Sequence, residues 1–266
     1  MRRSCLIPAA LAVLTLAACG RSEGTADRTA ADGASALTGQ LDYWSMLAPL
    51  IAGSHGGDCT RLPASEPLRG AAITLGLDGR LTAPGVDVDM RRAQMIQLGR
   101  ESRDGAIQIS AMLSIDATDG PVLSLNDDGT ADGAAATLMR SESQISCAKG
   151  TPLDKLRRQP LYKAAAPVIE GAARTLKCGS MKTRMAWTST EFKVVDGMLT
   201  LGAETFDLRR ADKETLVYTA EEHQLAYSFS LPGGPLMYVF YDAAGRVRSV
   251  EGRTELETTH ACHIEA

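Results

Sequence analysis

The sequence predicts an α+β protein of two tandem homologous units, each an N-terminal helix followed by an antiparallel sheet of about five strands with one disulfide. Motifs recur at one long spacing, the apolar period changes from helical to strand-like inside each unit, and the cysteines follow the same register. The 266 residues, 44% of them hydrophobic and 23% charged, suffice for two ordinary cores and exclude a wholly disordered or fibrous chain.

The internal repeat is clearest in two segments that contain an Asp-Gly turn and an Asp-x-Arg-Arg-Ala motif. Residues 78–93 and 196–211 are identical at 8 of 16 positions without a gap. Residues 48–53 match 166–171 in the same order. The offsets lie between 114 and 119 residues, a period that indicates two tandem domains rather than a solenoid of short repeats.

The repeat divides the folded part of the chain into three segments. We expect the first unit at residues 41–148 and the second at residues 161–266. Between them, residues 149–160 are charged and contain two prolines, which is typical of a short linker.

Each unit is predicted to begin with a helix. The apolar residues at helical spacing are Tyr43, Leu47, Leu50 and Ile51 in the first unit, and Leu161, Ala165, Val168, Ile169, Ala172 and Leu176 in the second. Pro49 and Pro167 lie inside these segments. We therefore expect each helix to kink there or to restart with proline in its first turn.

Beyond the helices, apolar and more polar residues alternate with a period of two. The alternating apolar sets are Ile107, Ile109, Ala111, Leu113 and Ile115, and Leu225, Tyr227, Phe229 and Leu231. This pattern predicts strands with one face against a core. Hairpin turns are predicted at the Asp-Gly and Ala-Gly pairs 78–79, 104–105, 128–129, 196–197 and 244–245, because glycine permits the positive φ of a tight turn.

The first residues are predicted to be an export signal. Two arginines precede a mostly apolar run from Cys5 to Ala18, which is too short to span a bilayer. The run ends in Leu-Ala-Ala before Cys19, and this ending resembles the bacterial lipobox. The resemblance implies that residues 1–18 are removed and that Cys19 carries the lipid. The alternative is an ordinary secretory signal with an incidental cysteine.

The lipobox resemblance also implies a location. The residue after Cys19 is Gly20. An aspartate at this position would favour retention at the inner membrane, whereas glycine favours a periplasm-facing outer-membrane anchor. Residues 19–40 are small and polar, which is typical of a flexible tether. The net charge of −4 offers no general attraction to nucleic acid or to an anionic bilayer. Removal of residues 1–18 would leave 26 basic and 32 acidic residues, a net charge of −6.

The four remaining mature cysteines would lie in an oxidising compartment, where an even number indicates disulfides. Equivalence of the two units selects Cys59–Cys147 and Cys178–Cys262 among the possible pairings. Each bridge would tie the end of a helix to the last strand of its unit. A metal site built from these cysteines is the alternative, but the sequence has no CxxC pair.

The histidines have a simpler explanation than a metal or catalytic site. On a strand, His260 and Cys262 would share one face and His263 the other, and Cys262 is used by its disulfide. His55 lies in a glycine-rich turn and His223 at a strand start. We expect mostly solvent-exposed histidines, no catalytic residue, no metal and no cofactor.

Two other motifs are expected to be incidental. Residues 126–133 resemble a calcium loop but lack its alternating carboxylates and its terminal glutamate, so we expect a hairpin turn. Residues 146–149 satisfy S-x-x-K, the nucleophile motif of penicillin-recognising enzymes, but the companion motifs are missing.

The repeated Asp-Arg sets are Asp89, Arg91 and Arg92 in the first unit and Asp207, Arg209 and Arg210 in the second. On a strand, the aspartate and the first arginine would share a face and form a charge-assisted pair. We favour a scaffold role, because it explains the occurrence in both units. A ligand-binding role is the alternative.

The second unit holds ten of the twelve aromatic residues: Tyr162, Trp187, Phe192, Phe206, Tyr218, Tyr227, Phe229, Tyr238, Phe240 and Tyr241. The segment 237–241 is apolar on both faces of its strand, so each face must be covered. Packing of the two units against each other is the interpretation we favour slightly. The alternative is a protein partner, for which Tyr238, Phe240 and Trp187 would be anchors.

In architecture, two tandem helix-plus-sheet units are similar to beta-lactamase-inhibitor-type proteins, in which such units form a concave inhibitory face. In anchor, size and lack of catalytic groups, the chain also resembles periplasmic immunity lipoproteins that neutralise antibacterial effectors. These resemblances imply a non-enzymatic lipoprotein that binds and blocks a toxin or hydrolase in the periplasm. The alternatives are an envelope assembly scaffold and a small-ligand carrier or enzyme with a site between the units.

Overall fold

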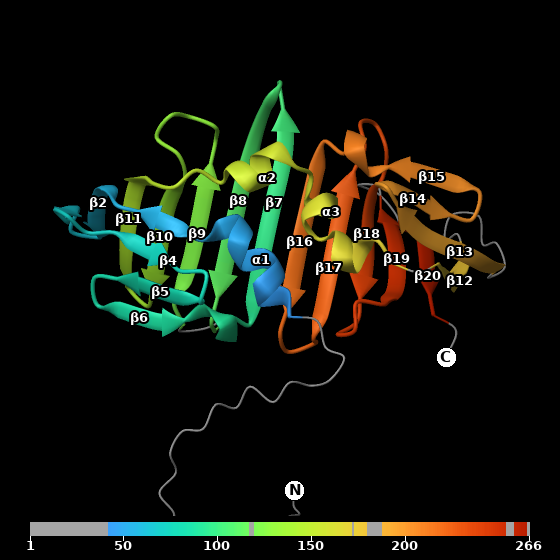
Figure 1. Cartoon of the computed structure of the whole chain (residues 1–266), viewed down its shortest axis with the longest axis horizontal. Helices are drawn as coiled ribbons and strands as arrows, with labels where there is room; N and C mark the ends of the chain where they lie inside the picture. Colours follow the sequence, from blue (N-terminus) through green and yellow to red (C-terminus); the bar gives the residue numbers. More distant parts are fainter. Residues whose placement is uncertain (1–41, 117–119, 172, 180–187, 254–257, 265–266) are drawn as a thin grey trace, which may run out of the picture. The chain divides into compact units, whose positions relative to one another are not determined.

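The computed structural model describes residues 42–116, 120–171, 173–179, 188–253 and 258–264. One compact unit runs from Thr38 to Ala266 and holds the described core and both disulfides. It is mostly antiparallel β-sheet with a few short helices (Figure 1). Residues 38–266 therefore form a self-contained folding unit.

Two sheets make up this unit. The large sheet has 16 strands in the order β15-β14-β13-β12-β20-β19-β18-β17-β16-β7-β8-β9-β10-β11-β2-β3. Its strands are β2 (Gly57–Leu62), β3 (Glu66–Pro67), β7 (Met95–Arg103), β8 (Ala106–Ser114), β9 (Val122–Asp127), β10 (Ala135–Arg140), β11 (Ser143–Lys149), β12 (Arg174–Gly179), β13 (Thr188–Val195), β14 (Met198–Leu201), β15 (Glu204–Asp207), β16 (Lys213–Thr219), β17 (Gln224–Ser230), β18 (Leu236–Tyr241), β19 (Val247–Arg253) and β20 (Thr258–His263).

The small sheet has four strands in the order β1-β4-β5-β6. They are β1 (Gly53–His55), β4 (Ile73–Leu75), β5 (Arg80–Ala83) and β6 (Val86–Asp89). The helices are α1 (Tyr43–Ile51), α2 (Asp154–Arg158), α3 (Leu161–Ala164) and α4 (Ala166–Ile169), with short 3-10 helices η1 (Met90–Arg92) and η2 (Leu208–Arg210).

The N-terminal helix forms as its apolar spacing predicts. All four expected core residues of α1 are buried, and the Asp42 carboxylate caps the helix by accepting the Ser45 N–H at 3.1 Å. α1 also reaches the second half of the chain. The Tyr43 hydroxyl donates to the Asp242 carbonyl at 3.1 Å, and its ring lies 4.5 Å from that of Tyr218.

The second helical segment is shorter than expected. It divides into α3 and α4, and Pro167 stands in the first turn of α4, as the predicted restart requires. Leu176, expected on the helix, is instead buried in β12. The helix ends earlier because Glu170 already has extended backbone and Gly171 follows it. Ala172 lies outside the described residues.

The segment expected to be a linker contains α2, which lies against β8. Leu153 and Leu156 are buried there. These two leucines provide the apolar contacts that hold an otherwise charged segment on the sheet.

The segments with a period of two are strands, as predicted. β8 buries Ile109, Ala111 and Leu113. β17 buries Leu225, Tyr227 and Phe229 in the same way. The pairs 104–105 and 196–197 have positive φ at both residues, which suits the tight turns that join their strands.

The repeated sequence motif folds in the same way in both halves. In each half, the carbonyl of the turn glycine accepts the N–H of the first residue of the 3-10 helix at 2.8 Å. That first residue and one leucine of the strand that follows the turn are fully buried. The residues concerned are Gly79 and Gly197, Met90 and Leu208, and Leu81 and Leu199. The repeat identities thus mark turn and core positions.

The two halves share one sheet, which corrects the expectation of a separate sheet for each. β7 pairs with β16 without interruption from Met95↔Thr219 to Glu101↔Lys213. Two separate sheets would each leave an unpaired edge here, and joining them satisfies the backbone groups of both. The halves also differ, because β4–β6 belong to the small sheet whereas β13–β15 continue the large one.

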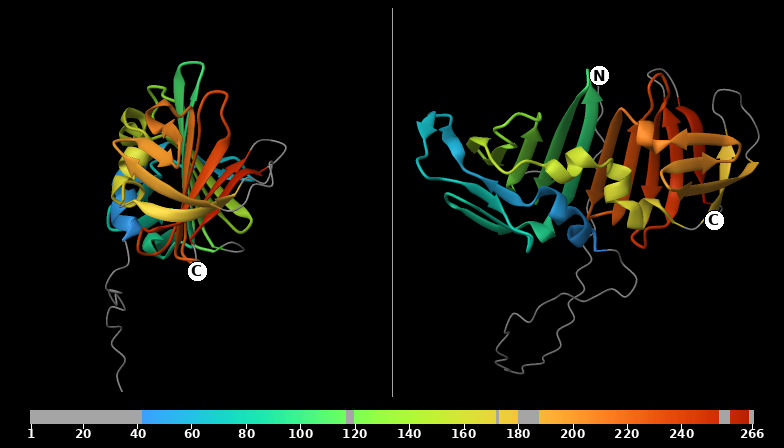
Figure 2. Two further views of the ribbon diagram at one scale, coloured as in Figure 1. Left: turned by 90° about the vertical axis from the view of Figure 1, so that its right-hand side faces the viewer. Right: turned by 45° about the horizontal axis from the view of Figure 1, so that its top comes forward.

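The helices all lie on one face of the large sheet, as Figure 2 shows from the side. The small sheet and the strands β13–β15 lie over this same face (Figure 1). No helix in the described part of the chain covers the opposite face, which we call the open face.

Both disulfides have the expected pairing. Each joins residues that stand directly opposite on neighbouring strands, Cys59 with Cys147 on β2 and β11, and Cys178 with Cys262 on β12 and β20. Each ties the first large-sheet strand after the helices of its half to the last strand of that half.

Among the described residues, no helix has both the length and the apolarity needed to cross a bilayer.

Candidate binding face of the sheet

The open face presents small and polar side chains at the middle of the sheet. Because side chains alternate along each strand, the residues between buried core positions on β7, β8, β16 and β17 share this face. Directly opposed neighbours form a row across five strand boundaries: Tyr238, Ser228, Thr215, Gly99, Ser110 and Asn126.

Two aromatic rings stand on the open face at the β18 end of this row. Tyr238 and Phe240 alternate with the buried Met237 and Val239, and their rings are stacked with centroids 6.3 Å apart and 12° between their planes. Both side chains are half-buried. They lie on β18, two strand spacings, or roughly 10 Å, from β16.

The favoured explanation for the two apolar faces of segment 237–241 is therefore wrong. The described strands of the first half do not lie over Tyr238 and Phe240, because the halves join edge to edge through β7 and β16. Trp187, the third expected anchor, lies outside the described residues.

A groove of about 400 Å³ hollows the sheet where the halves meet, and we call it the central groove. It spans β16, β7, β8 and β9, and its lining residues are Gln97, Gly99, Arg100, Glu101, Gln108, Ile109, Ser110, Asn126, Asp127, Asp128, Lys213, Glu214 and Thr215. None belongs to a helix, so the groove opens on the open face. A Cβ on Gly99 would lie 2.5 Å from Ser110 Oγ, so a larger residue there would require the Ser110 hydroxyl to rotate away.

Beneath the groove, the carboxylate of Glu214 is fully buried and holds α3 on the sheet. Glu214 Oε2 accepts the Leu161 N–H at 3.0 Å, and Oε1 accepts the Tyr162 N–H at 3.1 Å and the Tyr227 hydroxyl at 2.9 Å. Arg100 Nη1 lies 3.5 Å from Oε2. Burial raises the pKa of Glu214, and these hydrogen bonds and the Arg100 charge oppose the rise without reversing it.

A second buried carboxylate holds α2. Asp127 Oδ2 accepts the Leu153 N–H at 2.7 Å, Oδ1 accepts the Gly129 N–H at 2.9 Å, and the Arg157 guanidinium pairs with Oδ1. Arg157 Nη1 also donates to the Ile107 carbonyl at 3.1 Å. Burial alone would raise the pKa of Asp127, but the two backbone donors and Arg157 lower it overall.

The stability of the wild type relative to Glu214→Gln is expected to fall as the pH rises. In the folded protein the pKa of Glu214 is raised above its ordinary value of 4.5, which is the value expected in the unfolded chain. Below that unfolded pKa the protonated side chain contributes its full stability. This contribution is lost as the pH rises through the folded pKa. Urea unfolding of both proteins between about pH 4 and about pH 8 measures this trend. A wild-type advantage that grows with rising pH would contradict it.

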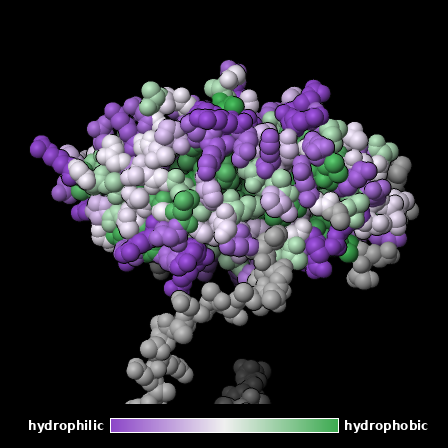
Figure 3. All heavy atoms as spheres, viewed as in Figure 1, coloured by the Kyte–Doolittle hydropathy of each residue, from purple (hydrophilic) through white to green (hydrophobic). Residues whose placement is uncertain are grey.

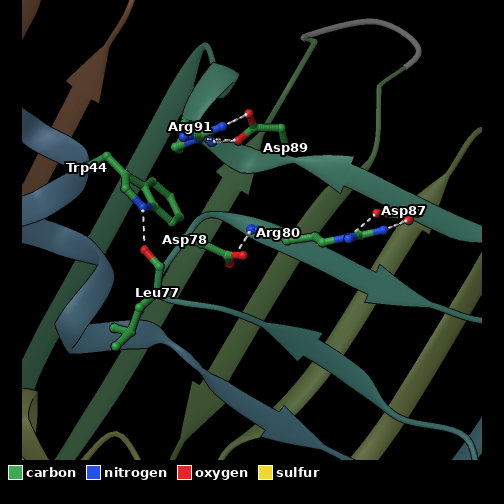
Figure 4. A network of polar contacts seen from close by, with 7 residues as sticks. All are labelled: Trp44, Leu77, Asp78, Arg80, Asp87, Asp89 and Arg91. Carbon is green, nitrogen blue, oxygen red and sulfur yellow. Dashed lines mark hydrogen bonds and ion pairs between the residues drawn. The ribbon is translucent and has the colours of Figure 1, made fainter. Parts of the chain in front are cut away.

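Only the aspartate of each repeated Asp-Arg set lies in a strand, and the arginines follow in a 3-10 helix, which corrects the expectation that the whole set lies on a strand. Asp89 ends β6 and caps η1, accepting the Arg91 N–H at 3.0 Å and its guanidinium Nε at 2.9 Å (Figure 4). Asp207 and Arg209 repeat this around η2, at 3.1 and 2.7 Å. Each aspartate keeps extended backbone as the last residue of its strand, and its carboxylate closes the turn onto the following residues. This geometry supports the scaffold interpretation.

The first of these sets belongs to a hydrophilic surface. Charged side chains gather over β5, β6 and η1 on the face that bears the helices (Figure 3). Arg80 Nε donates to Asp87 Oδ1 at 2.9 Å across the β5–β6 hairpin. Nearby, Trp44 Nε1 donates to the Leu77 carbonyl at 3.1 Å and attaches α1 to the small sheet (Figure 4). These exposed pairs each contribute little to stability.

His55 departs from the expected exposure. It lies in β1 with 1% of its surface exposed, its Nδ1 is 2.9 Å from the Ala134 carbonyl, and burial lowers its pKa. The His55 side chain is buried because it points from β1 toward the loop before β10, where Ala134 lies. His223 lies in the turn before β17 with positive φ, and His263 is exposed at the end of β20. The side chain of His260 lies outside the described residues.

The two other motifs lie where expected. The loop that resembled a calcium site joins β9 to β10 as a hairpin connection, and the S-x-x-K segment lies in β11. Among the described residues, no group of three or more His, Cys, Asp and Glu side chains is placed to hold a metal ion.

Sequence reasoning did not find the two buried carboxylates. Asp127 was considered only as part of a calcium-like loop, and Glu214 was not considered. A usable signal exists, because both occupy the apolar register of their strands: Asp127 follows Leu123 and Leu125, and Glu214 precedes Leu216. An acidic residue at a core position requires a buried partner.

Comparison of the chain with known protein families, characterised proteins and solved structures finds no match. Cys19 lies outside the described residues.

Proposed function

We propose that the chain is a non-enzymatic, lipid-anchored periplasmic protein at the outer membrane that binds another protein through its open face, as an inhibitor or immunity protein against a toxin or hydrolase. The single observation behind this proposal is the Tyr238–Phe240 ring pair, two strands from the edge of the central groove, on the face that no described helix covers. Aromatic anchors next to small, polar surroundings are typical of protein interfaces. The disulfides support an oxidising compartment.

We also propose that the chain arose by internal duplication and works as a fused pseudo-dimer. Leu98 stands opposite Leu216 in the β7–β16 ladder, and these positions are 118 residues apart, the offset of the repeated motif. Exchanging the halves maps this pairing onto itself, as in a two-fold symmetric interface. The open face would then be a single surface built from two related halves.

Replacing Cys19 by serine in the full chain is expected to move the protein from the membrane fraction to the soluble periplasmic fraction. The thiol is the acceptor of the lipid, and without acyl chains the body has nothing to hold it at the bilayer. Palmitate labelling and fractionation measure the effect, with Cys5→Ser as the control that retains both. A Cys19→Ser chain that still labels and sediments with membranes would overturn the anchor.

Replacing Tyr238 and Phe240 together by alanine is expected to weaken partner binding roughly thirtyfold or more, since aromatic anchors at hot spots contribute about 2 kcal/mol or more. Residues 38–266, oxidised, are used to capture a partner from a periplasmic extract, and the purified pair is then titrated. Thr137→Ala with Ser146→Ala is the control, because these residues oppose each other on the same face, toward the far end of the sheet.

The proposal requires one stoichiometric partner that the double alanine variant loses and the control retains. Equal binding by both variants would reject the open face as the binding surface. Suppression of the partner's toxic or hydrolytic activity supports inhibition. An envelope assembly component bound without loss of activity would assign the scaffold role instead.

A further inference from the structure

We propose that the central groove receives an arginine side chain carried by a protruding loop of the protein partner. This inference rests on the proposed protein-binding function and specifies the chemistry of the partner.

The floor of the groove lacks large side chains. Gly99 is opposed by Thr215 on β16 and by Ser110 on β8, so three small residues stand side by side across the seam between the halves. Its volume of about 400 Å³ falls within the range of sites that enclose a ligand. This exceeds a single side chain, so part of the loop that carries it would enter as well.

The charges in the groove favour a cation. Four carboxylates and two cations line it, but Asp127 and Glu214 are neutralised on the helix-bearing side by Arg157 and Arg100. On the open face, Lys213 pairs with Glu101, and the charge of Arg157 also acts on the carboxylate of Asp128.

The surface pair is loose. Lys213 Nζ lies 3.8 Å from Glu101 Oε2, and both side chains are about half exposed, at 57% and 44%. Hydrogen bonds from Thr130 lower the pKa of Asp128, so its carboxylate is charged at neutral pH. With Arg157 included, the four carboxylates of the groove face three cations, and the one net negative charge that remains attracts a cationic group.

The uncharged lining favours a group with many hydrogen-bond donors. Gln97, Gln108 and Asn126 provide amide oxygens, and Ser110 and Thr215 provide hydroxyls. A guanidinium has five N–H donors in a planar fork, which suits several oxygen acceptors on a flat sheet.

An apolar occupant would fit poorly. Ile109 is the one apolar residue among those that line the groove, and only 2% of its surface is exposed. An apolar side chain would therefore cover the amides, hydroxyls and carboxylates without pairing them, at a cost in free energy.

Argininamide is the probe for this site, with citrullinamide as its uncharged analogue, titrated into isotope-labelled residues 38–266 and followed by amide shifts. We expect saturable shifts at Gly99, Ser110 and Asn126, and affinity at least tenfold weaker for citrullinamide. Glu101→Gln with Asp128→Asn should weaken argininamide binding roughly tenfold, since a hydrogen bond to a charged group is lost. Glu222→Gln, outside the groove, is the control and should leave the affinity unchanged.

Shifts that do not saturate, that fall outside the groove, or that citrullinamide reproduces equally would overturn this inference. Saturable binding of triacetylchitotriose in the groove, with none of argininamide, would assign a glycan site instead. Protein capture that survives the Glu101→Gln, Asp128→Asn double variant rejects the arginine site and leaves the proposed function standing. Argininamide binding without any captured partner rejects the proposed function alone.

Discussion

Asp127→Asn is expected to lower the free energy of unfolding by about 3–5 kcal/mol, the usual cost of removing one partner from a buried ion pair. The Asp127 side chain is fully buried and binds the Leu153 N–H, the Gly129 N–H and Arg157. Asparagine has a single acceptor oxygen, so it would leave the Arg157 charge unpaired and at least one backbone donor without its acceptor. Urea unfolding of residues 38–266 at neutral pH measures the loss.

The matched control for this prediction is Asp154→Asn, on α2, the helix that also carries Arg157, the partner of Asp127. Asp154 pairs with Arg158 at 2.8 Å, but its side chain is 50% exposed and that of Arg158 is 77% exposed. Its loss should therefore cost no more than about 1 kcal/mol. Similar losses for the two variants would mean that Asp127 does not hold the α2 segment on the sheet.

Removing either disulfide by a double cysteine-to-alanine change is expected to cost about 4–5 kcal/mol, and the two changes should cost the same. The bridges join residues separated by 88 and 84 positions in sequence, so they restrict the unfolded chain to nearly the same degree. Denaturant unfolding of each double variant, compared with the oxidised wild type, gives the two values.

Both variants should also retain a single unfolding transition. The β7–β16 ladder joins the two halves, and one hydrophobic cluster contains core residues from both. The loss of a bridge in one half therefore weakens the whole unit. Two separate transitions in either variant would mean that the halves unfold independently.

Local pattern predicted much of this fold. The helical spacing of α1, the alternation in β8 and β17 and the turn at Asp104-Gly105 each depend on residues close in sequence, and each is confirmed. The disulfide pairing followed from the repeat register and is also confirmed.

The arrangement of the halves was not predictable in this way. Two edge strands of neighbouring sheets can pair only if both edges are left uncovered by the rest of the fold. The sequences of β7 and β16 contain no feature that marks them as such edges. The expected packing of the two units over segment 237–241 is not found among the described strands for this reason.

The candidate site was predictable only in part. Tyr238 and Phe240 were singled out because their strand is apolar on both faces, and the structure places them on the open face. The central groove depends instead on small residues that three strands from different halves bring together, and no local pattern links Gly99, Ser110 and Thr215.

The entry point of the chain has a mechanical consequence. α1 begins next to the seam, where Tyr43 contacts Tyr218 and the Asp242 carbonyl of the other half. Any tension that reaches the fold through the N-terminal segment therefore acts near its midline and is shared by both halves. A force applied at the start of α1 would therefore load the large sheet beside the β7–β16 ladder and not at either outer edge, β15 or β3.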